Sequence, residues 1–187
     1  DIHVSNTGTT FLARNDGGVF VDISLTVEAL SNRPKGDISW ATDFVDVDND
    51  GRRELFTAFG YMPTKGPTGG PEGTANSPWQ ANTLWRWLPD EESYEDIAPD
   101  LGLADTAYTR TFVPADFDRD GFPEVLTWSL DQGLALNHAG CNENAWLRVS
   151  LRTEGRNRAA IGAKITATFD DRTVVGHISA GSSGSMS

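Results

Sequence analysis

Two short stretches of the sequence place acidic side chains at alternate positions of what must be a tight loop. The first, DVDNDGRRE, covers residues 46–54, and the second, DFDRDGFPE, covers residues 116–124. In both, positions 1, 3 and 5 are Asp, position 6 is Gly and position 9 is Glu. Alternate acids in such a loop can turn their oxygens toward one centre, the glycine permits the bend, and position 7 can add its backbone carbonyl. Without a cation the converging carboxylates would repel one another, and some of their pKa values would rise.

This set of oxygen donors is typical of a Ca²⁺ site, because Ca²⁺ takes six to eight oxygens and tolerates irregular geometry. The sequence therefore predicts two calcium sites, with water completing each shell. The ligands of the first would be Asp46, Asp48, Asp50, the Arg52 carbonyl and Glu54. The ligands of the second would be Asp116, Asp118, Asp120, the Phe122 carbonyl and Glu124.

Two alternatives compete with this interpretation of the loops. A helical calcium hand shares positions 1, 3, 5 and 6 but has its bidentate Glu at position 12. This chain has Thr57 and Thr127 there, so the helical hand is rejected. A metal-free Asp/Gly turn stays open for a single copy, because Asp readily makes local backbone hydrogen bonds. The recurrence of the whole spacing favours calcium.

The segments around the loops predict an all-β chain. They are short, rich in Val, Ile, Phe and Trp, and separated by turn residues, which is typical of strands. Neither 24–30 nor 97–105 is long enough for a stable helix. The expected strands lie in HVS, GVFVDIS, ELFTAFG, NTLWRWL, EVLTWSL, WLRVSL, KITATF and VVGHIS.

An internal repeat appears when the loops are aligned. LARN, LWRW and LALN, which begin at Leu12, Leu84 and Leu134, occupy equivalent places, and Asp22 of VFVDIS matches Asp96 of SYEDIA. Each unit then has four short antiparallel strands, the signature of a propeller blade. We expect about two and a half such blades in residues 1–141. The acidic pattern is missing from residues 142–187, where we expect a second β module of three strands.

The loops resemble the FG-GAP/VCBS repeats of integrin-α-type β-propellers, which bind calcium through D-x-D-x-D-G-x-x-D; here Glu replaces the last Asp. The C-terminal module resembles the ASPIC/UnbV module in NAWLRVSL, GRNRAAIGAKI and AGSSGSMS. Together they resemble the cartilage-acidic-protein-like group of secreted or surface proteins. The resemblance implies an incomplete propeller followed by a partial ASPIC/UnbV module, in an extracellular or cell-surface setting.

Composition excludes several classes of function. The formal net charge of −12 repels phosphate backbones, which disfavours nucleic acid as a partner. The sequence has no apolar run near the roughly 20 residues that a membrane span needs. Cys141 is the only cysteine, so no internal disulfide can form. His3, His138 and His177 lie apart and beside no nucleophile motif, and we expect no enzyme activity.

We therefore expect a calcium-binding propeller segment with a role in adhesion, recognition or assembly, and with a glycan or a protein as its ligand. Two alternatives remain open: the non-catalytic part of a secreted propeller enzyme acting on polysaccharide, and a lectin-like binder that stacks glycans on Trp. About two and a half blades cannot close a propeller. We expect the strand edge near residues 1–8 or 134–150 to pair with another polypeptide or with the rest of the propeller.

Overall fold

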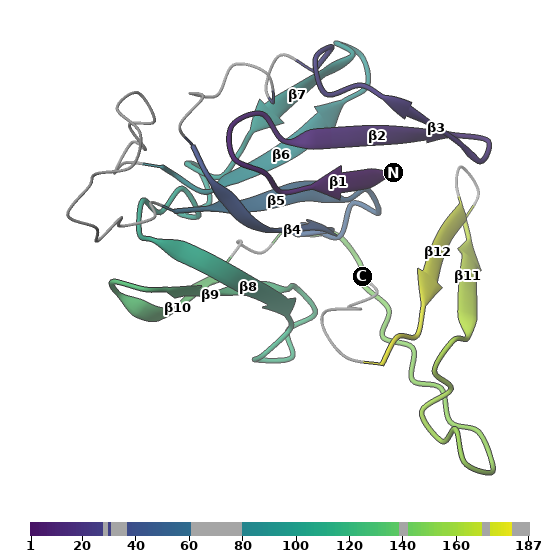
Figure 1. The fold of residues 1–187 in the computed structure, drawn as a ribbon. Helices are drawn as coiled ribbons and strands as arrows, with labels where there is room; N and C mark the ends of the chain where they lie inside the picture. Colours follow the sequence, from purple (N-terminus) through teal and green to yellow (C-terminus); the bar gives the residue numbers. More distant parts are fainter. Residues whose placement is uncertain (28–29, 31–36, 61–79, 139–141, 170–172, 181–187) are drawn as a thin grey trace.

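The computed structural model describes residues 1–27, 30, 37–60, 80–138, 142–169 and 173–180 (Figure 1). These residues form several antiparallel sheets, none of which closes on itself, so the prediction of an all-β chain is confirmed. The blades and the incomplete propeller stay predictions. Within the described ranges, no helix is long and apolar enough to cross a bilayer. Residues 61–79 lie outside the described residues. They form the Gly/Pro-rich segment between the second and third predicted strands of the middle unit.

Three sheets and one hairpin follow one another along the chain. The first sheet has the order β1 (Ile2–Val4), β2 (Phe11–Asp16), β3 (Val19–Asp22). The second has the order β4 (Ser39–Val45), β5 (Glu54–Phe59), β6 (Thr83–Leu88), β7 (Ser93–Asp96). The third has the order β8 (Thr109–Ala115), β9 (Glu124–Ser129), β10 (Gly133–His138). The hairpin pairs β11 (Lys164–Thr168) with β12 (Thr173–His177) and stands apart from the sheets in Figure 1.

The second sheet is the centre of the protein because both of its faces are covered. Successive side chains of β5 point to opposite faces. On one face Phe56 packs on Phe112 of β8, with 4.3 Å between the ring centroids. On the other face Leu55 packs with Leu12 of β2. All six residues of β5 (ELFTAF) are therefore buried, including the polar Glu54 and Thr57.

The outer faces of the first and third sheets carry exposed apolar side chains. On the third sheet they are Val113, Trp128, Leu134 and Leu136. In the first sheet Ile2, Val4, Phe11 and Phe20 are exposed. In the described part of the chain β10 pairs only with β9, and β1 pairs only with β2. What lies against these edges stays a prediction.

One predicted strand of the C-terminal module is wrong. WLRVSL, within residues 144–151, has no strand pairing, and the described module has only β11 and β12. The reason lies in what this segment contacts. Its alternate side chains Asn144, Trp146 and Arg148 reach the two acidic loops, so the segment runs across the loops instead of along β11.

The predicted alignment of LALN with the other repeats is also wrong, by two residues. In the second sheet Phe56 pairs with Leu84, and in the third the equivalent Leu126 pairs with Leu136, not with Leu134. The tight turn between Ser129 and Gly133 sets this register. Because side chains alternate with a period of two, the shift leaves each residue on the face that the alignment predicts.

Candidate metal centre

The two acidic loops have the same backbone conformation. The first joins β4 to β5 and the second joins β8 to β9. At position 4, Asn49 and Arg119 have φ values of 56° and 69°, and at position 6 Gly51 and Gly121 have φ values of 80° and 99°. Position 6 needs glycine because other L residues rarely take such a φ. The two loops share this turn although they differ at positions 2, 4, 7 and 8, so the turn follows from the residues they have in common, the Asp, Gly and Glu at positions 1, 3, 5, 6 and 9.

The three aspartates of each loop converge, as predicted. Asp46, Asp48 and Asp50 each offer a carboxylate oxygen within 4.8 Å of the others, and so do the three aspartates at 116, 118 and 120. Backbone amides help to orient them. The amide of Asp50 donates to Oδ1 of Asp48 at 3.1 Å, and the amide of Arg52 donates to Oδ1 of Asp50 at 2.7 Å.

The second loop repeats this network. The amide of Asp120 donates to Oδ1 of Asp118 at 3.0 Å, and the amide of Phe122 donates to Oδ1 of Asp120 at 2.8 Å. At position 7 Arg52 is exposed whereas Phe122 is buried. The proposed role of their carbonyls as ligands stays a prediction in both loops.

The aspartate at position 1 is the part of each loop that fits a cation most clearly. Asp46 is 2% exposed, and its Oδ2 accepts a hydrogen bond from the amide of Gly51 at 2.9 Å. Its Oδ1 is buried with no hydrogen-bond partner among the described residues, and Oδ1 of Asp116 is in the same situation. Burial, and then repulsion by Asp50 and Asp48, raise the pKa of Asp46 to about 6. A buried oxygen without a partner costs about 1–3 kcal/mol, and a cation bound there would remove that cost.

The glutamate at position 9 closes each loop onto its own second residue. Glu54 is buried, and its Oε2 accepts from the amide of Val47 at 3.1 Å. Glu124 does the same for the amide of Phe117 at 2.7 Å. Burial raises the pKa of Glu54 to about 7. Both glutamates are therefore placed at the loops as predicted, with one oxygen of each committed to the backbone.

Sequence reasoning missed the basic residues that face these acids. Nη2 of Arg86, on β6, lies 2.6 Å from Oδ2 of Asp48, and its Nε lies 3.5 Å from Oε1 of Glu54. Arg148 pairs with Asp116 in the second loop. Because Leu55 pairs with Trp85, the next residue of β6 must face Glu54. The predicted repeat places the strand of Arg86 beside the strand of Glu54, but only the observed register brings Arg86 opposite Glu54. Arg148 comes from a segment with no strand pairing.

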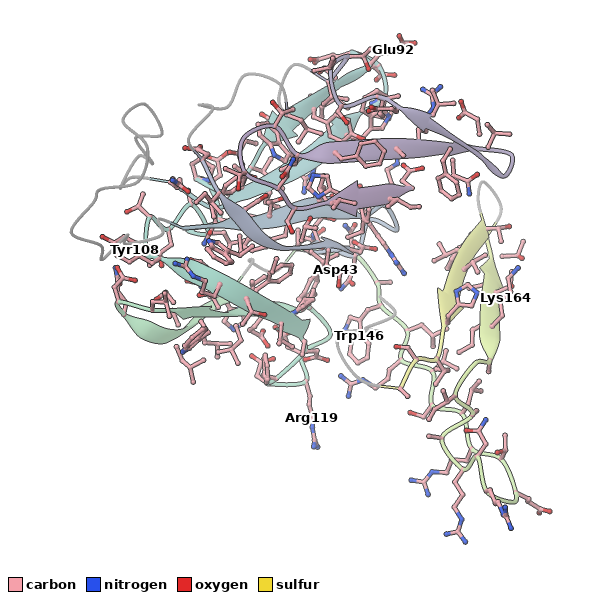
Figure 2. The ribbon with its side chains drawn as sticks, in the orientation of Figure 1. Asp43, Glu92, Tyr108, Arg119, Trp146 and Lys164 are labelled. Atoms are coloured by element: carbon pink, nitrogen blue, oxygen red, sulfur yellow. The ribbon has the colours of Figure 1, made fainter. Side chains whose placement is uncertain are left out.

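The two loops contact each other, and the same C-terminal segment packs on both of them. Nδ2 of Asn49 donates to the Gly121 carbonyl at 2.9 Å, which links the first loop to the second. The side-chain amides of Asn142 and Asn144 donate to the Asp48 carbonyl at 2.7 and 2.9 Å. Trp146 packs against Gly121 so closely that a Cβ there would overlap its indole ring. In Figure 2 Trp146 lies between the loops and the β11–β12 hairpin, whereas Arg119 points outward.

The chemistry available at this centre is the binding of cations by oxygen. Each loop offers three converging carboxylates, one of which has a buried oxygen without a donor. Arg86 and Arg148 offset part of the negative charge. Models of known protein families give no match to this chain, and no curated protein matches it either.

Proposed function

We propose that this chain is a calcium-stabilised, non-enzymatic segment of an extracellular β-propeller that serves adhesion, recognition or assembly. The observation that carries the proposal is the pair of equivalent buried oxygens, Oδ1 of Asp46 and Oδ1 of Asp116, which have no hydrogen-bond partner in the described part of the chain. Two loops with the same turn and the same unsatisfied atom suit a common ligand. The FG-GAP/VCBS resemblance supplies the propeller and the extracellular setting as expectations.

The ion in this proposal has a structural role: its binding free energy would stabilise the packing of the second sheet against the third. The carboxylates are held within their turns by backbone hydrogen bonds. Each turn joins two strands of a sheet, and the Asn49–Gly121 hydrogen bond joins the second sheet's loop to the third sheet's loop. Calcium would offset the burial of the Asp46 carboxylate and its repulsion by Asp50 and Asp48, which together raise the pKa of Asp46, and would thereby stabilise the contact between these sheets. Calcium that binds only the folded state at 100 times its Kd adds about 2.7 kcal/mol per site.

The experiment compares thermal unfolding and calorimetric titration of the protein in EDTA, Mg²⁺ and Ca²⁺. We expect two Ca²⁺ ions per chain and a higher Tm with Ca²⁺ than with EDTA. Asp48→Ala should remove the first site and leave the second. Arg52→Ala should keep both sites, because position 7 would contribute only its backbone oxygen.

Asp100→Ala is the matched control, since Asp100 is exposed and outside both loops. Its Tm should respond to Ca²⁺ as the unmodified chain does. The proposal is wrong if Ca²⁺ and EDTA give the same Tm and calorimetry detects no binding. Loss of a site in Arg52→Ala would show instead that the ligand set is wrong.

A further inference from the structure

The two acidic loops differ at one position that bears directly on metal chemistry. In the third sheet His138 pairs with Glu124, and in the second sheet Arg86 is the residue that faces Glu54. His138 therefore occupies in the second loop the place that Arg86 occupies in the first. A guanidinium is always protonated and cannot ligate a metal, whereas a neutral imidazole is the commonest metal ligand in proteins.

His138 forms a compact group of donors with two acids of the second loop. Asp118, Glu124 and His138 each offer one ligand atom, and these atoms all lie within 4.8 Å of one another. Nε2 of His138 is 3.4 Å from Oδ2 of Asp118, and its Nδ1 is 3.4 Å from Oε1 of Glu124. These distances exceed the roughly 2.7–3.2 Å of an ordinary N–H···O hydrogen bond. The two contacts use different ring nitrogens, and only one of these can bind a given ion. The carboxylate oxygen nearest that nitrogen lies at about the 3.3 Å expected between two ligands of a tetrahedral ion with bonds of about 2.0–2.1 Å, and the other carboxylate would have to move closer to complete the set.

Glu124 supplies an independent indication of a ligand. Its side chain is 1% exposed, and its Oε2 is held by the amide of Phe117 at 2.7 Å. Its other oxygen, Oε1, faces His138 and has no hydrogen-bond partner in the described ranges. A buried carboxylate oxygen of this kind costs free energy unless a donor or a cation satisfies it.

The site is accessible to an ion from solvent. The side chains of Asp118 and His138 are 51% and 54% exposed. They close the group on its solvent side, while Glu124 forms the buried side. An ion can therefore enter without opening the sheet, and water can complete its coordination shell.

We propose that Asp118, Glu124 and His138 bind a divalent transition-metal ion of the Zn²⁺ class, and that the first loop cannot, because Arg86 replaces the imidazole. Zn²⁺ accepts a donor set of one nitrogen and two carboxylate oxygens. The imidazole makes this set more suitable for Zn²⁺ and similar metals than for Ca²⁺, which prefers oxygen donors alone. The inference rests partly on the proposed function, because Asp118 and Glu124 are also proposed calcium ligands. Zn²⁺ and Ca²⁺ should therefore compete at the second loop and not at the first.

The experiment titrates the metal-free protein with Zn²⁺ by calorimetry and with Co²⁺ by visible absorption, since bound Co²⁺ reports a nitrogen ligand and its geometry. We expect one Zn²⁺ or Co²⁺ ion per chain. His138→Arg and His138→Gln should each weaken binding tenfold or more. Arg86→His should create a second Co²⁺ site with a similar spectrum.

Controls address the other donors and the proposed calcium sites. His177→Ala and Cys141→Ser should leave Zn²⁺ affinity unchanged, and excess Zn²⁺ should displace one of the two Ca²⁺ ions. Unchanged Zn²⁺ affinity in both His138 variants would mean an adventitious ion only and would overturn the inference. Zn²⁺ binding that depends on His138, in a protein that binds no Ca²⁺, would support the inference and reject the proposed calcium function.

Discussion

Replacing Asp46 by Asn should stabilise the protein when divalent cations are removed and weaken its response when Ca²⁺ is added. Asp46 is 2% exposed, and its Oδ2 accepts from the amide of Gly51. An Asn side chain has the same shape and can keep that bond through its oxygen. Its amide nitrogen would lie near the carboxylates of Asp48 and Asp50, which offer oxygens within 4.8 Å of that of Asp46, so the substitution removes a like charge without leaving a cavity.

The size of the effect follows from the pKa of Asp46. Burial raises the pKa from 3.8 to about 6, and each unit corresponds to about 1.4 kcal/mol. Keeping Asp46 ionised in the folded protein at neutral pH therefore costs at most about 3 kcal/mol. The folded state binds the proton more tightly than the unfolded state, so this acid lowers stability as pH rises from about 3.8 to about 6. The advantage of Asp46→Asn should thus be small near pH 4 and full above pH 6–7.

Calcium should reduce this advantage. At 100 times its Kd, an ion that binds only the folded state adds about 2.7 kcal/mol, and the variant would lose that gain at the first site. The gap of about 3 kcal/mol should therefore nearly close, and it should reverse at higher Ca²⁺ concentration. The change in sign distinguishes a metal ligand from a buried acid that is merely unfavourable.

Urea unfolding followed by tryptophan fluorescence measures both effects. The unmodified chain, Asp46→Asn and the exposed control Asp100→Asn would be compared in EDTA near pH 4 and near pH 7.5, and then in Ca²⁺. Asp100→Asn should stay within about 0.5 kcal/mol of the unmodified chain throughout. A variant at Asp46 that is less stable in EDTA near pH 7.5, or that gains as much from Ca²⁺ as the unmodified chain, would refute the argument.

Three further predictions test the fold around the centre. Burial lowers the pKa of His3 to about 4, so the unfolded state binds more protons between about pH 4 and 6.5 and the protein loses stability as pH drops through that range. His3→Leu should remove this loss, and the difference in unfolding free energy between the variant and the unmodified chain measures it. Phe56→Ala should cost about 3–5 kcal/mol in urea unfolding, because the ring is fully buried, and a cost under 1 kcal/mol would contradict the stacking. Gly121→Ala should lower the Tm far more than Gly102→Ala, since both have positive φ but only Gly121 has Trp146 against it; equal Tm shifts would show that this contact does not form.

Local sequence patterns determined the strands and the acidic loops. Each of the predicted strands except WLRVSL contains or overlaps a described strand, because alternating apolar residues and turn residues act within a few positions of one another. The converging aspartates at 46, 48 and 50 were predictable for the same reason. Their spacing and the glycine at position 6 are properties of nine consecutive residues.

Only the tertiary structure decided which residues complete the centre. Arg86, His138 and Arg148 reach the loops from other strands or from the C-terminal segment. Their positions depend on strand register and on the path of the chain, which local pattern does not specify: the short turn before β10 moved the partner of Leu126 to Leu136. The segment after residue 142 has the alternation of a strand, yet its alternate side chains Asn144, Trp146 and Arg148 contact the two loops. Contacts between distant parts of the chain therefore override local preference here, as they generally do for strands.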